Sequence, residues 1–358
     1  MRFCLAVDHG EWWRCSGPRP RCSEMALAVL ADHIGLDSLW LNEDPDGWDA
    51  FAILGAIAAV TSRLRLGPGV TNPYQRHPNL LAASVATLDR LSHGRAFLGL
   101  GRGQPEWHTV GLGLPPYPPL SLLEETVQLL DQWWTPPFRA SASGPILVQN
   151  WERSVHPAAP PPRYLAAAGP KALRLAGRLF DGVLFNELAS VPFMRQAIAT
   201  ARQAAIEAGR DPASLSFFAN PAVVVTDDPE PILERKKALI ATVYVLPGME
   251  RLLDVPGFDV PGLIARLRAL MRVDDVLARG GGFPELRRAG DLAAARALVP
   301  TDLVAQLAIV GTLDSVRSRL ADLEVIGVTH VFLDRHGLPR DPEAAQSLLA
   351  MLQQRSES

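Results

Sequence analysis

The sequence predicts a parallel α/β protein, most simply a closed (β/α)8 TIM barrel with insertions. Eight short apolar runs alternate with amphipathic stretches along the chain, and this alternation is typical of parallel sheets. No G-x-G-x-x-G motif follows the first run, which weakens the alternative of an open, doubly wound sheet. A minimal eightfold barrel needs roughly 250 residues, so the 358 residues of this chain leave room for insertions.

Strands and helices can be placed in order from these runs. The strands are expected at residues 3–7, 37–42, 63–67, 95–101, 164–168, 182–186, 216–226 and 328–333. The helices are expected at residues 23–33, 49–61, 78–94, 121–134, 170–177, 191–208 and 229–245, with a last one capped by Thr312. The third helix shows the pattern well, because it opens with Pro78 and carries Leu81, Val85 and Leu88 on one face.

Two stretches interrupt the alternation, and we interpret them as insertions into a single domain that spans residues 1–358. Residues 136–162 are rich in proline and lack periodicity, which predicts an excursion over the surface. Residues 246–300 hold helical pieces at 263–273 and 292–298, separated by three consecutive glycines. This second insertion could close over a site and select a substrate, or serve as a plain surface or dimer contact.

Composition and charge exclude several classes of function. The net charge of −3 and the pI of about 6.3 give no sign of a nucleic-acid partner. The longest apolar run, at residues 51–60, is half of what a membrane span needs, and no signal peptide is recognisable, so we expect a cytoplasmic protein. Cys4, Cys15 and Cys22 lack metal spacing and are expected to be free thiols, although a disulfide between the last two stays open; no metal site is predicted.

Polar and glycine-rich motifs follow three of the expected strands, at the end where barrels carry their chemistry. Residues 67–78, G-P-G-V-T-N-P-Y-Q-R-H-P, form either a tight loop or a rigid ligand contact. Residues 99–104, G-L-G-R-G-Q, would let a flat ring or a backbone approach closely, and Arg102 within them is a surface charge or an anion partner.

The fifth strand leads into a candidate anion site. Gly169 can cap the next helix and Pro170 can open it, which leaves the N–H groups of Lys171 and Ala172 free. These groups, the helix dipole and the lysine side chain would together favour an anion. An ordinary helix start is the alternative.

Adjacent carboxylates, Glu43 and Asp44, follow the second strand and could transfer protons or accept hydrogen bonds from a polar ring. Other polar residues near the barrel mouth, more often structural than catalytic, are Asp8, His9, His77 and His108. No nucleophile elbow, H-E-x-x-H or P-loop is present, so hydrolase and nucleotide-triphosphatase functions have no support.

Taken in order, these motifs resemble the luciferase-like flavin and deazaflavin oxidoreductases. The similarity is nearest to the branch that uses coenzyme F420, typified by methylenetetrahydromethanopterin reductase. The segments that carry it are residues 33–41, 61–78, 88–103, 166–186 and 311–331. Most of the chain is covered in the right order, apart from the two insertions.

The resemblance implies where a cofactor would bind. It implies a non-prolyl cis peptide between Gly69 and Val70, forming a bulge against which the central ring packs. The residues that match the family's cofactor contacts are Glu43, Gly69, Val70, Asn72, Arg102, Gly103 and Gln104, with Ala168, Gly169, Lys171 and Ala172 as the phosphate cradle.

Two departures from the family pattern affect the catalysis. Asp44 stands where these enzymes often have a histidine, and Gln104 stands where they often have an acid. Because an amide cannot transfer a proton at neutral pH, the proton chemistry of the family cannot be carried over. The candidate catalytic residues are therefore Asp44, Glu43 and Arg102.

The leading hypothesis is an F420-dependent oxidoreductase that transfers a hydride to or from a small organic substrate, with the protein supplying position and electrostatics. The alternative is a monooxygenase that uses reduced FMN, since the same barrel and phosphate site serve either ring. A third hypothesis is a non-catalytic cofactor-binding relative, prompted by Asp44 and Gln104. The resemblance also implies a homodimer.

Overall fold

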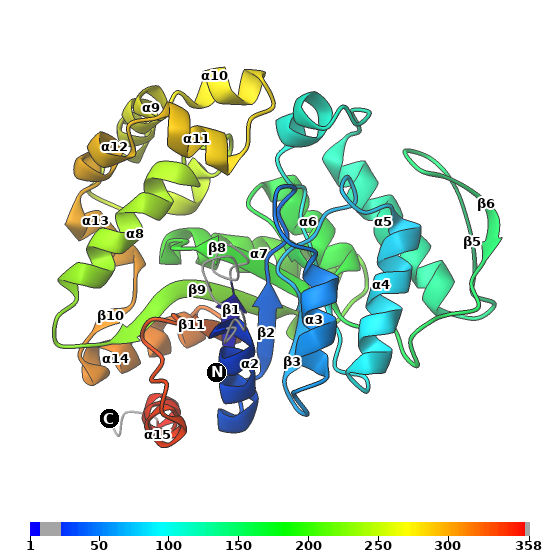
Figure 1. Ribbon diagram of the computed structural model, residues 1–358, viewed down its shortest axis with the longest axis horizontal. Coiled ribbons are helices and arrows are strands. Elements are labelled where there is room, and N and C mark those ends of the chain that lie inside the picture. Colours follow the sequence, from blue (N-terminus) through cyan, green and yellow to red (C-terminus); the bar gives the residue numbers. More distant parts are fainter. Residues whose placement is uncertain (8–22, 355–358) are drawn as a thin grey trace, which may run out of the picture.

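The computed structural model describes residues 1–7 and 23–354, and within these residues eight parallel strands form a nearly closed barrel (Figure 1). The strands are β1 (Arg2–Val7), β2 (Ser38–Leu41), β3 (Arg65–Pro68), β4 (Leu98–Leu100), β7 (Arg163–Ala166), β8 (Gly182–Glu187), β9 (Ser216–Val225) and β11 (His330–Leu333). Their order is β3-β2-β1-β11-β9-β8-β7-β4. Thr71 closes the ring, because its N–H donates to Gly99 (3.0 Å) and its carbonyl accepts from Gly101 (2.9 Å). The predicted (β/α)8 barrel is confirmed.

Helices surround the barrel much as expected. They are α2 (Ser23–Ile34), α3 (Ala50–Ala58), α4 (Pro78–Leu91), α5 (Pro119–Trp134), α6 (Pro170–Leu179), α7 (Val191–Glu207), α8 (Glu230–Thr242), α14 (Leu313–Val325) and α15 (Pro342–Gln353). Thr312 caps α14 by accepting from the N–H of Ser315, as predicted. The C-terminal helix α15, capped by Asp341, was not among the expected elements.

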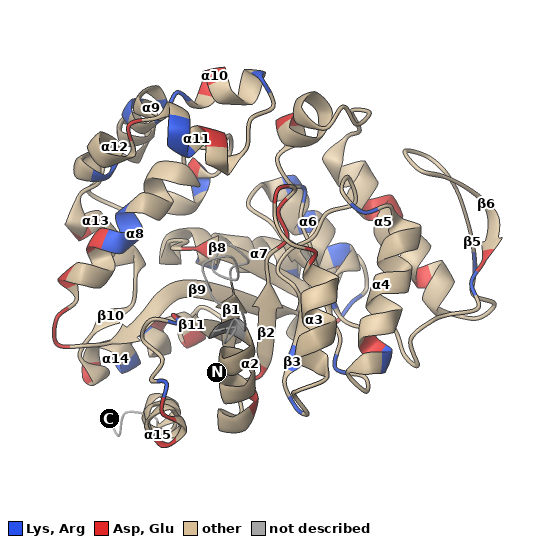
Figure 2. Cartoon of the chain, in the orientation of Figure 1, with Lys and Arg blue, Asp and Glu red and all other residues tan. Residues whose placement is uncertain are grey.

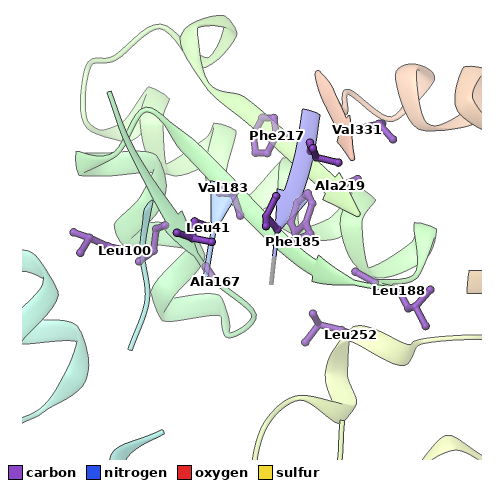
Figure 3. Packing of buried hydrophobic residues seen from close by; sticks show 14 of the residues in the cluster. Leu41, Leu100, Ala167, Val183, Phe185, Leu188, Phe217, Ala219, Leu252 and Val331 are labelled. Carbon is purple, nitrogen blue, oxygen red and sulfur yellow. The ribbon is translucent and has the colours of Figure 1, made fainter. Parts of the chain in front are cut away.

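Side chains alternate between the inside and the outside of the barrel. Outward residues such as Phe185 and Phe217 pack beneath the helices (Figure 3). Inward residues fill the barrel with a separate, mostly aromatic cluster: Cys4, Trp40, Phe97, Tyr164, Phe218 and Phe332. Burial raises the pKa of the Cys4 thiol, so Cys4 is a neutral, free thiol in the core, as expected. The other sequence expectations near the N-terminus, at Asp8, His9, Cys15 and Cys22, lie outside the described residues.

The first insertion contains regular structure that its sequence did not reveal. Strands β5 (Arg139–Ser143) and β6 (Leu147–Glu152) pair as an antiparallel hairpin, which was not among the expected elements. The reason is that only one face of the hairpin is covered. Ala140 and Val148 are buried whereas Leu147 and Trp151 are exposed, which leaves too few buried positions for a clear alternation.

The second insertion is a helical layer at the top of the molecule in Figure 1. It holds η3 (Glu250–Leu253), α9 (Val260–Leu270), α10 (Val273–Ala278), α11 (Phe283–Ala289) and α12 (Leu292–Leu298), followed by α13 (Thr301–Leu307) and β10 (Val310–Gly311), which pairs with β9. The helical pieces predicted around the three glycines are confirmed. The N–H of Ser190, just after β8, donates to the carbonyl of Leu252 (2.8 Å), and Leu188 and Leu252 belong to the same buried hydrophobic cluster (Figure 3). The insertion is therefore attached to the strand ends.

Charged side chains are dispersed over the helices in the view of Figure 2, with both signs interspersed. Across the described part of the chain, no helix combines the length and the apolar character that crossing a membrane requires.

Candidate functional site

The sequence motifs lie at the carboxyl ends of β2, β3, β4 and β7, which are consecutive neighbours around the barrel. Because all four strands are parallel, their ends meet at one side of the same barrel mouth. The structure thus brings the predicted site residues into one region.

Glu43, after β2, has its carboxylate buried and fully engaged. It accepts from Thr71 Oγ1 (2.5 Å), from the N–H of Ala50 (3.4 Å) and from the guanidinium of Arg76, whose Nη2 lies 2.6 Å from Oε1. The same Arg76 nitrogen also contacts Asp49 Oδ2 (2.6 Å). These partners make Glu43 a group that positions the loops after β2 and β3, and its predicted catalytic role stays a prediction. Arg76 lies in the quoted strand-three motif, but nothing in the sequence paired it with Glu43.

Asp44 is placed differently from its neighbour. Its side chain is half-buried and accepts from Asn42 Nδ2 (3.3 Å), while its backbone carbonyl accepts from the N–H of Gly47 (2.9 Å). Of the two carboxylates, that of Asp44 is the more accessible.

A cis peptide joins Gly69 and Val70, as the resemblance implies. The first two strand-four glycines make room for this segment. A Cβ at Gly101 would lie 2.7 Å from Val70 Cγ2, and one at Gly99 would overlap the carbonyl oxygen of Pro68. The close approach expected at these glycines is therefore made by the protein's own backbone and Val70.

Gly103, with φ of +62°, brings together the ends of β3 and β4. A Cβ there would overlap Nε2 of His108 and lie 3.4 Å from Cγ of Asn72, which is buried and accepts from the N–H of Gln75 (2.9 Å). His108 is completely buried and stacks on Tyr74 at a centroid distance of 5.0 Å, and neither of its ring nitrogens has a hydrogen-bond partner among the described residues. Burial lowers the pKa of His108 and favours the neutral ring.

Gln104 is buried and donates from Nε2 to the carboxylate of Glu106. Position 104 thus lacks a carboxylate, but the half-buried carboxylate of Glu106 lies next to it, two residues further along the chain. Glu106 was not among the site residues expected from the sequence. Its spacing from the strand-four glycines is the signal that could have found it.

Arg102 is exposed and donates from Nη2 to the carbonyl of Pro247 (2.9 Å). This bond links β4 to the start of the second insertion. A guanidinium has five N–H donors, so the remaining donors of Arg102 could still bind an anion.

The residues of the predicted phosphate cradle lie between the end of β7 and the start of α6, and their role in binding a phosphate stays a prediction. Helix α6 begins after Gly169, with the half-buried Ala168 before it, and no side chain of the described residues caps the N–H groups of Lys171 and Ala172. Arg251 from the second insertion adds a cation here, because its Nη1 lies 3.6 Å from where a Cβ of Gly169 would be. These uncapped N–H groups and two cationic side chains fit the phosphate of a flavin or deazaflavin cofactor. Arg251 was missed because its stretch of sequence has no periodicity to place it.

His77, the second described histidine named from the sequence, has a structural role. His77 caps α4 by accepting from the N–H of Asn79 (3.1 Å).

Comparison with known proteins agrees with this geometry. The family model for luciferase-like monooxygenases matches residues 6–330. The chain is 28% identical over 305 residues to 5,10-methylenetetrahydromethanopterin reductase of Methanolobus tindarius, covering 85% of this chain and 87% of that protein. It is 35% identical over 178 residues to an F420-dependent glucose-6-phosphate dehydrogenase of Nakamurella multipartita, covering 45% and 51% of the two chains.

Solved structures show the same fold. The coenzyme F420 dependent tetrahydromethanopterin reductase from Methanopyrus kandleri superposes with a TM-score of 0.74 at 23% identity, over 99% of this chain and 98% of that one. The resemblance drawn from the sequence motifs is therefore confirmed, and the chain belongs to the luciferase-like monooxygenase family.

Proposed function

We propose that this protein transfers a hydride between coenzyme F420 and a small organic substrate. The observation that carries the proposal is the start of α6 after β7, where uncapped N–H groups and Lys171 meet Arg251 at the same barrel mouth as the cis peptide that follows β3. The cradle suits the phosphate of either FMN or F420. The choice of F420 rests on the relatives, whose names specify F420-dependent enzymes.

The relatives are oxidoreductases, and the chain is an enzyme of the luciferase-like oxidoreductase type. When bound, F420 would supply the ring that carries the hydride, and the protein would supply position and electrostatics. In this proposal Lys171, Ala172 and Arg251 hold the phosphate. Val70 and Asn72 lie beside the ring, and Arg102 faces an anionic group of the cofactor or the substrate.

A proton must accompany many hydride transfers, and two carboxylates at the barrel mouth are candidates to move it. Asp44 is half-buried after β2, and Glu106 is oriented by its hydrogen bond from Gln104 after β4. Glu43 is a weaker candidate because Arg76 occupies its carboxylate.

The second candidate function is a monooxygenase that uses reduced FMN. The description of the family model favours it, and a monooxygenase from Streptomyces bottropensis shares the fold with a TM-score of 0.64. A non-catalytic cofactor-binding protein is the third candidate, prompted by Asp44 and Gln104 at the places of the family's proton-transfer groups.

Binding of each cofactor to the purified protein tests the order of these candidates. We expect tight binding of F420, followed by absorbance and fluorescence, and weak binding of FMN. Tight FMN binding without F420 binding would reverse the order. Cofactor binding without turnover of any oxidisable or reducible substrate tested would favour the third candidate.

We further propose that the protein is a cytoplasmic homodimer without nucleic-acid or membrane partners. Light scattering coupled to size-exclusion chromatography would measure its mass in solution, and a mass of one chain would contradict the dimer.

A further inference from the structure

A cavity of about 310 Å³ lies where the loop after β2, the segment after β4 and the second insertion meet. Pro45 and Asp46 form its first wall, and they directly follow the carboxylates Glu43 and Asp44. The second wall begins at Trp107, three residues beyond Gln104. Two of the four loops that form the proposed cofactor site therefore also supply residues to the walls of this cavity.

The third wall comes from the insertion, through the three glycines and α11. Gly280 packs against Gly111 so closely that a Cβ on Gly111 would lie 2.6 Å from the carbonyl oxygen of Gly280. This backbone contact joins the insertion to the π-helix η1 (Trp107–Gly111), which follows β4 along the chain. In Figure 1, α10 and α11 face the segment that follows β4.

Apolar side chains make up much of the lining. Leu112 and Pro284 line the cavity together with Trp107, whose indole is held edge-on by Phe283 at a centroid distance of 4.9 Å. The volume is at the lower end of the range for small-molecule sites. A compact, ring-sized molecule therefore fits better than an extended one.

The charges on the walls are not all neutralised by the protein. Glu285 is paired with Arg279, whose Nη2 lies 2.9 Å from Oε1. Arg288 on α11 and Asp46 on the β2 loop make no hydrogen bond or ion pair with any other described residue. One guanidinium and one carboxylate, on different walls, are thus available to a ligand.

We propose that this cavity is the substrate pocket, and that it takes a compact, largely apolar carboxylate that also bears a hydroxyl or amino group. Arg288 binds the carboxylate, since a guanidinium fork matches carboxylate geometry, and Asp46 accepts from the hydroxyl or amine. This inference rests on the proposed function, because it treats the cavity as the substrate side of that site. It gives the second insertion the substrate-selecting role that its sequence left open.

Calorimetric titration of the F420-loaded protein with three small probes tests the proposal. The probes are 4-hydroxybenzoate, benzoate and 4-hydroxybenzamide, which carry both groups, the carboxylate alone and the hydroxyl alone. We expect 4-hydroxybenzoate to bind most tightly. Replacing Arg288 by Ala should weaken both carboxylates about five- to tenfold and leave the amide unchanged, whereas Asp46→Ala should weaken only the two hydroxyl compounds.

Arg287→Ala is the matched control, because Arg287 is an exposed neighbour on α11 that does not line the cavity. The inference would be overturned if the two arginine variants had equal effects, if 4-hydroxybenzamide bound as tightly as 4-hydroxybenzoate, or if no probe bound. F420 loading is followed separately by its fluorescence. If the protein does not bind F420 but the unloaded protein binds the probes in a way that depends on Arg288, the proposed function is wrong and the proposed pocket stands. If the protein binds F420 but probe binding does not depend on Arg288, only the proposed pocket is wrong.

Discussion

Arg76 holds the carboxylate of Glu43 with two nitrogens: Nε lies 3.0 and 2.9 Å from its two oxygens, and Nη2 lies 2.6 Å from Oε1. The side chains are 10% and 1% exposed. A buried pair of this kind fixes the loops after β2 and β3 relative to each other, directly beside the cis peptide at Gly69 and Val70. The pair therefore holds two of the loops of the proposed site in place.

Replacing Arg76 by Ala should therefore lower the free energy of unfolding by about 3–5 kcal/mol, because it leaves the Glu43 carboxylate buried without its cation. Urea unfolding monitored by circular dichroism measures the change. The exposed Arg287, replaced in the same way, should alter stability by no more than about 0.5 kcal/mol. A similar small loss in both variants would show that the buried pair is not needed for the fold.

Stability should fall as the pH drops below 6.5, in part because of His330 at the start of β11. Burial lowers the pKa of His330 to about 4, although Asp37, 3.7 Å away, raises it and Arg2 and Arg65 lower it further. The unfolded chain, with the ordinary value of 6.5, binds the proton first, so the stabilisation is present above pH 6.5 and is lost as the pH falls toward 4. The loss should be about 3 kcal/mol between pH 7 and pH 4.

Urea unfolding at a series of pH values, compared between the wild type and His330→Phe, isolates this contribution from the other titrating groups. The variant should lose less stability over the same interval. The exposed His33 provides the control, since His33→Gln should keep the wild-type slope. Parallel curves for the wild type and His330→Phe would contradict the prediction.

Arg251→Ala should weaken F420 binding about five- to tenfold, because it removes a cation from the uncapped start of α6. The loss should shrink at 0.5 M salt, which screens the partly exposed charge. Fluorescence titration gives both dissociation constants. Arg174→Ala, which removes an exposed arginine further along α6, should leave binding unchanged. An unchanged affinity in Arg251→Ala would place the phosphate elsewhere.

Glu106→Gln should lower kcat by at least about tenfold and leave the F420 dissociation constant unchanged, if Glu106 moves the proton that Gln104 cannot. The pH dependence of kcat should lose one limb in this variant, and Glu106→Asp should recover part of the rate. Should Asp44→Asn show these effects while Glu106→Gln turns over normally, the proton-transfer role belongs to Asp44.

Much of the architecture could be predicted because it depends on local patterns. The alternation of apolar runs located the eight barrel strands, and Pro78 and Thr312 marked helix starts that the structure confirms. The hairpin β5–β6 was missed because it buries one sparse face, and α15 was missed although Asp341 caps it like the other helices.

The sequence by itself determined the order of the elements and which loops reach the barrel mouth, because both follow from periodicity and from the parallel strands that it implies. Only the tertiary structure decided the partners within that mouth. Arg76 meets Glu43 across 33 positions of chain, and Arg102 reaches Pro247 across 145. Arg251 and Arg288 come from an insertion whose sequence pattern does not indicate where its residues lie relative to the strands. Such long-range contacts depend on how separate elements pack, which no local pattern encodes.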